Sequence, residues 1–281
     1  MPEMQKTFSE SDLKSFEPEL KIGLLATVND EGLPHITLIS TLQASSPTRM
    51  FWGQFAEGLS KVNIRKNPKV GWLILTLDKN VWRGKASFNE TARSGKEFDL
   101  LNNTPMFRYN AYFGIHTVYY MDLVEQTGKQ ALPMGAVIQA AIKTMIAKAL
   151  AGKGSREILN LFTRKLVDKM DNLKFLAYID KDGYPVIIPV IQSQTASADR
   201  VIFASSVYKD DLQAVPSGAP VAFFCMSFQM QTVMLRGAYK GLSNIGGVEC
   251  GSLEVDYVYS PMPPKAEQIY PYKKLETVTS F

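Results

Sequence analysis

A hydroxyl, an ammonium group and a carboxamide fall within four residues of one another, at Ser60, Lys61 and Asn63. They stand at the start of a short helical stretch that runs through Lys66, where backbone N–H groups have no partner inside the helix. The oxygens of a phosphate ester can be satisfied by each of these groups. The competing interpretation is an ordinary helix cap followed by a solvated lysine. The stretch therefore predicts either an anion site or a plain helix start.

Other side chains with reactive chemistry are sparse. His35 and His116 are the only histidines, and neither has a nucleophile pattern beside it or a second metal ligand four residues away. A hydrolytic triad and a zinc site are therefore not expected. The two cysteines, Cys225 and Cys250, lack both metal-type spacing and a disulfide-dense pattern, which favours a reduced, cytoplasmic setting.

An internal repeat determines how these groups are positioned. The segment from Leu24, LLATVNDEGLPHITLIS, matches the segment from Phe175, FLAYIDKDGYPVIIPVI, and the same offset of 151 residues holds to Val70 and Val221. Each copy begins with two apolar stretches joined by a polar turn that ends in glycine, which is the pattern of a β-hairpin. Six short strands are expected in each copy, and their spacing predicts a closed antiparallel barrel.

Helices are expected before each barrel and between the two copies. The apolar periodicity predicts helices over 9–16, 134–150 and 155–170. The boundary lies near residue 153, so the expected domains are 1–152 and 153–281. The connection from Phe88 to Ile115 is long and rich in aromatic residues, which predicts a loop that either walls a substrate or contacts a second subunit.

Charge and hydropathy exclude several classes of protein. The 281 residues include 31 basic and 27 acidic side chains, mixed along the chain, whereas a nucleic-acid-binding surface needs a concentrated basic patch. The most apolar helix, over 134–150, is interrupted by Gln139, Lys143 and Lys148 and falls short of a membrane span. No nucleic-acid or membrane partner is expected, and the protein is expected to be cytoplasmic.

The order of these elements resembles the FMN-binding split barrels, the family of pyridoxamine 5'-phosphate oxidase-like proteins. The stretch Gly58 to Val70, GLSKVNIRKNPKV, looks like the family's Ser-x-Lys, Asn-Leu/Ile and Asn-Pro-x-Val signature, and Val81–Ala86 continues the match. The resemblance implies a mainly β fold with helices (α+β), in which two tandem six-stranded antiparallel split β-barrels are joined by a helical segment. The second copy follows the order of elements but lacks the motif, with Asp211 at the position of Ser60.

The resemblance also implies a cofactor site. In the family the isoalloxazine ring of FMN lies across the second and third strands at a barrel–barrel interface, and the phosphate lies at the short helix. The matching positions are Thr37, Ser40, Thr41, Trp52, Gly53, Gln54, Ser60, Lys61, Asn63, Trp82 and Arg83. Two of these residues have an alternative interpretation. Trp52 fits a core position better than a stacking partner, because aromatic residues in strands usually pack. Arg83 recurs as Arg236, which fits an ion pair across the two barrels as well as ligand binding.

The function that follows is that of a flavoprotein. The resemblance implies an FMN-dependent oxidoreductase that acts on a small-molecule redox substrate or accepts electrons from a nicotinamide donor, with no catalytic acid, base or nucleophile identified. The alternative is a non-catalytic flavin, deazaflavin or haem carrier, or a ligand-free interaction barrel. The two repeats are expected to pack as an intrachain counterpart of a homodimer, and a homodimer of the whole chain stays open. One FMN per chain is the expected maximum, because Asp211 would repel a phosphate.

Overall fold

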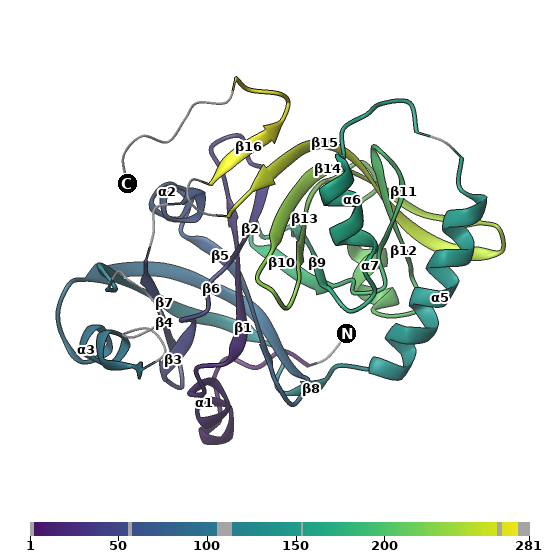
Figure 1. The fold of residues 1–281 in the computed structure, drawn as a ribbon. Helices are drawn as coiled ribbons and strands as arrows, with labels where there is room; N and C mark the ends of the chain where they lie inside the picture. The colour runs from purple at the N-terminus through teal and green to yellow at the C-terminus, as the bar shows by residue number, and fades with distance from the viewer. Residues whose placement is uncertain (1–2, 56–57, 106–113, 153, 263–265, 275–281) are drawn as a thin grey trace.

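Most of the described chain forms two antiparallel β-sheets that follow one another in sequence (Figure 1). The structure is a computed structural model that describes residues 3–55, 58–105, 114–152, 154–262 and 266–274. The first sheet contains β1 (Lys21–Val28), β2 (Pro34–Leu38), β3 (Gln43–Ser46), β4 (Arg49–Gln54), β5 (Lys69–Thr76), β6 (Asn80–Ala92), β7 (Thr117–Gln126) and β8 (Gln130–Ala131). The second contains β9 (Leu173–Ile179), β10 (Pro185–Pro189), β11 (Gln194–Ser197), β12 (Arg200–Ala204), β13 (Pro220–Met226), β14 (Thr232–Ile245), β15 (Val248–Ser260) and β16 (Glu267–Tyr270).

The two sheets have the same topology. The first runs β2-β1-β5-β6-β7-β4-β3 with β8 beside β6, and the second runs β10-β9-β13-β14-β15-β12-β11 with β16 beside β15. The register repeats as well: Leu24 faces Leu73 in the first sheet, and their counterparts Phe175 and Phe224 face each other in the second. The mainly β fold with helices and the tandem repeat expected from the sequence are therefore confirmed.

Two details of the expected barrels are wrong. Each sheet has eight strands instead of six, because β3 and β8 in the first sheet and β11 and β16 in the second were not anticipated. These strands are short, and β3 and β11 carry small polar residues, so no apolar alternation marks them in the sequence. The sheets are also not closed: β2 and β3, at the two ends of the first strand order, do not pair within the described residues.

The helices are α1 (Glu10–Phe16), α2 (Leu59–Lys66), α3 (Lys96–Asn103), α5 (Met134–Leu150), α6 (Leu161–Asp168) and α7 (Lys209–Ala214). Helix α6 begins six residues later than expected, because Asn160 is its N-cap and Ser155 instead donates its backbone N–H to the Asp199 carboxylate at 3.1 Å. The expected long loop is also wrong in part. Strand β6 continues to Ala92 and α3 follows it, while residues 106–113 lie outside the described residues.

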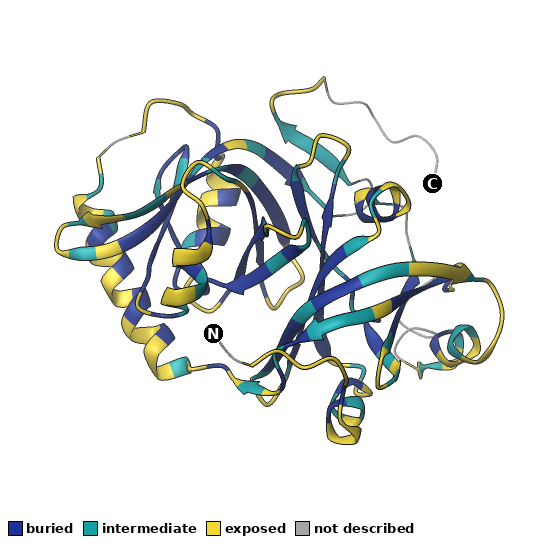
Figure 2. Ribbon diagram, turned by 180° about the vertical axis from the view of Figure 1, so that it is seen from behind, coloured by how far each residue is buried: buried dark blue, intermediate teal, exposed yellow. Residues whose placement is uncertain are grey.

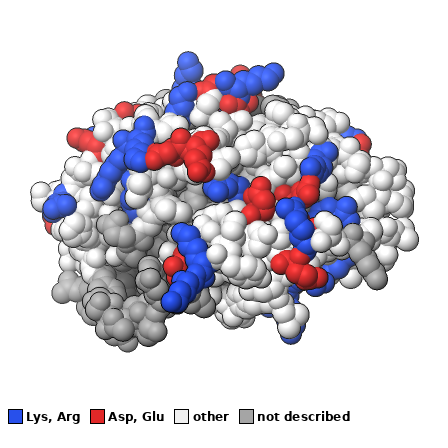
Figure 3. Space-filling view, turned by 90° about the horizontal axis from the view of Figure 1, so that it is seen from above, with Lys and Arg blue, Asp and Glu red and all other residues white. Residues whose placement is uncertain are grey.

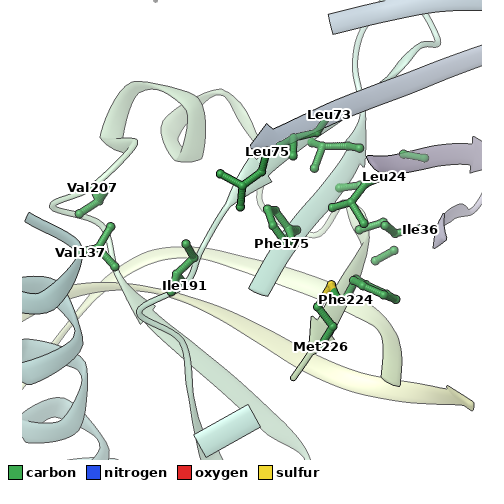
Figure 4. Close-up of a cluster of buried hydrophobic side chains, with 14 of the residues drawn as sticks. Leu24, Ile36, Leu73, Leu75, Val137, Phe175, Ile191, Val207, Phe224 and Met226 are labelled. Atoms are coloured by element: carbon green, nitrogen blue, oxygen red, sulfur yellow. The ribbon is translucent and has the colours of Figure 1, made fainter. Parts of the chain in front are cut away.

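A shared hydrophobic core joins the two sheets (Figure 4). Leu24 and Leu73 of the first sheet pack in one cluster with Phe175 and Phe224, their own repeat counterparts in the second. Strand β10 packs against β5, and β13 packs against β2. The backbones approach so closely that a Cβ on Gly71 would lie 2.2 Å from the carbonyl oxygen of Pro185. The two repeats thus form one continuous body with buried strands and exposed turns (Figure 2).

Helix α5 connects the two sheets and packs on the second one, against β11, β12 and β15. Its buried side carries Val137, Ala140 and Ala147, which join the shared core. The Thr144 hydroxyl accepts a hydrogen bond from the backbone N–H of Ala204 at 2.9 Å, so the helix is also tied to the end of β12. Among the described residues, no helix has the length and apolar character needed to cross a membrane.

Candidate functional site

A cavity of about 330 Å³ opens between the two sheets, within the size range of small-molecule sites. One wall comes from the first sheet and α2, and the other comes from the ends of β14 and β15 in the second sheet. The first wall holds six of the residues named from the sequence, which are Thr37, Ser40, Thr41, Gly53, Ser60 and Lys61. The structure therefore brings together residues that are up to 24 positions apart in the chain.

The Thr41 side chain, in the wall of the cavity, forms two hydrogen bonds to the backbone of Gly53. The Thr41 hydroxyl donates to the carbonyl oxygen of Gly53 at 3.2 Å and accepts from the N–H of the same residue at 3.0 Å. Thr41 is buried, so both bonds are shielded from water and hold the turn after β2 against β4. This makes Thr41 a positioning residue whose hydrogen-bonding capacity is largely used within the protein.

Helix α2 gives one end of the cavity a polar and positively charged character. Its N-cap, Gly58, has no side chain that could bond the first turn, so the N-terminal N–H groups are not capped from there. The Ser60 hydroxyl is fully buried and has no hydrogen-bond partner among the described residues. Lys61 is only 7% exposed, and its Nζ lies 6.0 Å from the centre of the Trp52 ring. A buried hydroxyl without a partner in a cavity wall, beside a lysine, is suited to an anionic ligand.

The second wall was missed by the sequence analysis. It is formed by Met230, Thr232, Tyr259, Pro261, Met262 and Ala266. The resemblance implied an interface between the barrels, but no motif in the second copy marks which of its residues meet the first. Burial raises the pKa of the Tyr259 hydroxyl to about 12, so this group stays protonated at neutral pH.

One histidine lies next to the cavity without lining it. The Nε2 of His35 is 3.3 Å from the Thr37 hydroxyl, and its ring meets Tyr259 edge-on with centroids 5.4 Å apart. Burial, reinforced by the positive charge of Arg236, lowers the pKa of His35 to about 4. At neutral pH the imidazole is therefore uncharged and serves to orient Thr37 and to pack between the sheets.

Three further residues named from the sequence lie behind the cavity wall. Trp52 stacks on Tyr119 with ring centres 4.2 Å apart, and it is fully buried in the core of the first sheet. The Tyr119 hydroxyl donates to Gln54 Oε1 at 2.8 Å. Asn63 donates from Nδ2 to the Thr27 hydroxyl at 3.0 Å, which anchors α2 to β1. In this structure all three support the wall instead of facing the cavity.

The last two named residues lie away from the cavity. Trp82 packs in the core of the first sheet, where its Nε1 donates to Asp12 at 2.8 Å. Arg83 donates from Nη2 to both carboxylate oxygens of Asp211, at 2.8 and 2.9 Å, and from Nη1 to the carbonyl oxygen of Ile187. This is the ion pair across the repeats that the sequence analysis left open.

The repeat-related position in the second sheet is filled by protein. Gln192, the counterpart of Thr41, donates to the carbonyl oxygen of Ala204 at 2.9 Å, just as Thr41 does to Gly53. The N–H of Ala204, however, is bonded to Thr144 of α5. Figure 4 shows Val137 of α5 directed toward Ile191 and Val207, which belong to the same cluster. Helix α5 thus occupies the space that corresponds to the cavity.

Charges on the outer surface are mixed. Figure 3 shows lysine and arginine interspersed with aspartate and glutamate on the face that it displays. Ion pairs also cross between the repeats: the Nζ of Lys85, a buried lysine, lies 3.0 Å from Asp180 and 2.7 Å from Asp182. The lysine that lines the cavity, Lys61, is also buried, at 7% exposed.

Solved structures of the FMN-binding split-barrel type are similar to this chain. An FMN-binding protein from Syntrophomonas wolfei is 16% identical, with 43% of this chain and 83% of that one covered and a TM-score of 0.35. HupZ from Group A Streptococcus is 12% identical over 44% of this chain and 98% of its own, with a TM-score of 0.35. An F420 reductase is 16% identical over 42% and 98%, with a TM-score of 0.34.

No family model matches the sequence, and no curated protein matches it. The structural neighbours are of the kind that the sequence resembles. At identities of 12–16% and TM-scores of 0.34–0.35 the likeness carries no argument about ligand or reaction. The site must be argued from the residues of this chain.

Proposed function

We propose that the chain binds FMN in the cavity between the two sheets and works as an FMN-dependent oxidoreductase. The observation that carries this proposal is the fully buried Ser60 hydroxyl, which lacks a partner among the described residues and lies beside Lys61 at the start of α2. A phosphate here would satisfy the hydroxyl, meet the ammonium group and lie at the positive end of the helix dipole.

The rest of the cavity suits a larger, partly apolar ligand attached to that phosphate. Thr37 and Ser40 are half-buried and offer hydroxyl groups to polar atoms, while Met230, Met262 and Tyr259 offer apolar and aromatic surface. A flavin combines these features, since its ring has a polar edge and broad apolar faces. When bound, FMN supplies hydride or electron transfer, and the protein binds it, orients it and excludes water.

A carrier without turnover is the second candidate, and the lining of the cavity favours it in one respect. The titratable side chains among the described lining residues are Lys61 and Tyr259. Tyr259 cannot exchange a proton readily near neutral pH, because burial raises its pKa to about 12. A flavin, a deazaflavin or haem held in this cavity would thus receive little acid–base help from Tyr259.

We expect one ligand per chain, because the position in the second sheet that corresponds to the cavity is filled by protein. Helix α5 occupies the equivalent position in the second sheet, and Asp211, at the place of Ser60, pairs with Arg83. We assign residues 1–152 and 153–281 to two domains. By this division α5 belongs to the first domain along the chain, although it packs on the second sheet. Whether two chains associate is a separate question from this stoichiometry.

The test is binding of FMN and riboflavin followed by flavin fluorescence. A charge-assisted hydrogen bond contributes about 1.5–3 kcal/mol, so Lys61→Ala should weaken FMN binding roughly tenfold to a hundredfold. Ser60→Ala should weaken it by a smaller factor. Riboflavin lacks the phosphate and should bind the wild-type protein and both variants about equally.

Lys66→Ala is the matched control, because this lysine lies on the same helix but is exposed and pairs with Asp30. It should leave FMN affinity unchanged. If Lys61→Ala bound FMN as tightly as wild type, the phosphate position would be wrong. If FMN binds as expected, its reduction by a nicotinamide donor would distinguish an oxidoreductase from a carrier.

A further inference from the structure

Helix α5 exposes its largest apolar side chains and buries its smallest. Five of these residues are 47–62% exposed, and we call them the α5 outer face: Ile138, Ile142, Met145, Ile146 and Leu150. The side that packs on the second sheet carries mainly small residues, namely Val137, Ala140, Ala141, Thr144 and Ala147. A helix that served only to cover a sheet would have the opposite pattern. Figure 2 shows the exposed side of α5 along the edge of the molecule.

The α5 outer face is continuous along the helix. Its members recur at spacings of three, four and one residues, which places them on one side of an α-helix. The 17 residues of α5 span about 25 Å at 1.5 Å per residue. Exposed apolar surface of this extent on one side of a helix is typical of an interaction site.

The segment that carries this surface has a net positive charge. Helix α5 itself has two lysines, Lys143 and Lys148, and no acidic residue. Lys143 is exposed, and Lys148 lies on the other margin of the outer face, with its Nζ 2.6 Å from Asp168. From Met134 to Met170 the sequence has seven basic and two acidic residues, a net charge of +5, whereas the whole chain has +4. The segment that carries the apolar face is therefore net positive in sequence, although Lys148, Arg156 and Lys169 each pair with a carboxylate.

We propose that the α5 outer face docks on an anionic lipid surface, with the helix lying in the plane of the interface. Lipid acyl chains would cover Ile138, Ile142 and Met145, and the lysine at the margin would extend its ammonium group to the headgroups. Anionic headgroups match the charge of the segment, and each basic residue near such a surface adds to the attraction.

A second copy of the chain is the less favourable occupant. Pairing α5 with its own copy would bring the exposed Lys143 of both helices near each other without an acidic residue on either helix to meet it, whereas Lys148 already pairs with Asp168. Residues 134–150 are too polar to span a bilayer, which is why no membrane partner is expected from the sequence. Lying on the surface is a different mode of contact, and it requires only one apolar side.

The experiment is co-sedimentation of the full chain with vesicles. One set is phosphatidylcholine alone, and the other contains about one third phosphatidylserine. We expect binding to the anionic vesicles, little binding to the neutral ones, and weakening by salt. The triple variant Ile138→Gln, Ile142→Gln, Met145→Gln should bind the anionic vesicles at least roughly tenfold more weakly. Lys143→Glu should weaken binding by a similar factor.

The controls are Leu77→Gln, which alters a still more exposed apolar side chain in the turn after β5, and Lys14→Glu, which reverses an exposed charge on α1. Both should bind like wild type. Equal binding of wild type to the two vesicle types, or no binding to either, would overturn the proposal. It would also be overturned if light scattering found a wild-type dimer that the triple variant abolishes, because the face would then be a self-interface. None of these measurements depends on a bound flavin.

Discussion

The pair between Arg83 and Asp211 provides the sharpest test of how the two repeats are held together. Its two hydrogen bonds measure 2.8 and 2.9 Å, and the side chains are only 6% and 16% exposed. Replacing Arg83 with methionine removes one partner and leaves a carboxylate in a mostly desolvated place. Breaking a buried pair in this way costs about 3–5 kcal/mol, whereas exposed pairs contribute about 1 kcal/mol or less.

The expected result is therefore a free energy of unfolding lower by about 3–5 kcal/mol for Arg83→Met, measured by urea denaturation at neutral pH. Asp211→Leu leaves the buried guanidinium without its partner and should also destabilise. The double variant Arg83→Met, Asp211→Leu should recover most of the loss, since replacing both charges by apolar side chains of similar size is often nearly neutral. The interaction energy from this double-mutant cycle should exceed about 1.5 kcal/mol.

The same variants decide the role of Arg83 in binding. Arg83 does not line the cavity between the sheets, so FMN affinity of the folded Arg83→Met protein should stay within a few-fold of wild type. The reasoning would be refuted if Arg83→Met kept its stability within about 0.5 kcal/mol of wild type but lost more than tenfold in FMN affinity. Arg83 would then be a ligand-binding residue and not a link between the repeats.

Three further outcomes are expected. Gly71→Ala should lower the free energy of unfolding by more than about 2 kcal/mol in a urea titration, because its Cβ would lie 2.2 Å from the carbonyl oxygen of Pro185. The control is Gly135→Ala, where a Cβ meets nothing within 4 Å; it should be neutral or stabilising in the same titration. The pKa of His35 falls from 6.5 to about 4 on folding, so between these pH values the unfolded state binds a proton that the folded state does not. The free energy of unfolding should therefore fall as the pH falls from 6.5 to 4, by up to about 3 kcal/mol relative to His35→Gln. Burial lowers the pKa of Lys174 from 10.5 to about 8, so the stability of wild type relative to Lys174→Met should instead rise between pH 8 and 10, and a flat difference would contradict that shift.

Local signals were sufficient to predict the frame of the fold. The hairpin turns, the Asn-Pro after α2 and the apolar periodicity of α5 each depend on neighbouring residues, and the structure has β1–β2, α2 and α5 where they were expected. The short polar strands escaped prediction because their pairing depends on partners far along the chain. Strand β3, for example, forms because Gln43 pairs with Phe51 of β4, and its own residues show no alternation of apolar and polar side chains.

The difference between local and long-range contacts also explains why one wall of the cavity was predicted from the sequence and the other was not. Thr37 to Lys61 belong to one copy of the repeat, and the helix-start chemistry of Ser60 and Lys61 is visible in four residues. Met230, Thr232 and Tyr259 meet the cavity only because β14 and β15 end beside the first sheet. A local sequence pattern has no means of encoding that contact. Arg83 was ambiguous for a related reason, since its partner Asp211 lies 128 positions away.

Because α5 fills the second of two related positions, the two copies of the repeat can diverge independently. In an assembly of two identical chains, every substitution enters both sites, so any change that improves one wall alters its twin. Here Ile191 and Ser40 are repeat counterparts, yet the first packs in the shared core and the second lines the cavity. Substitutions in one copy can therefore alter the shared core while those in the other alter the lining of the cavity. Because the two repeats are parts of one chain, each can keep its own sequence at equivalent positions.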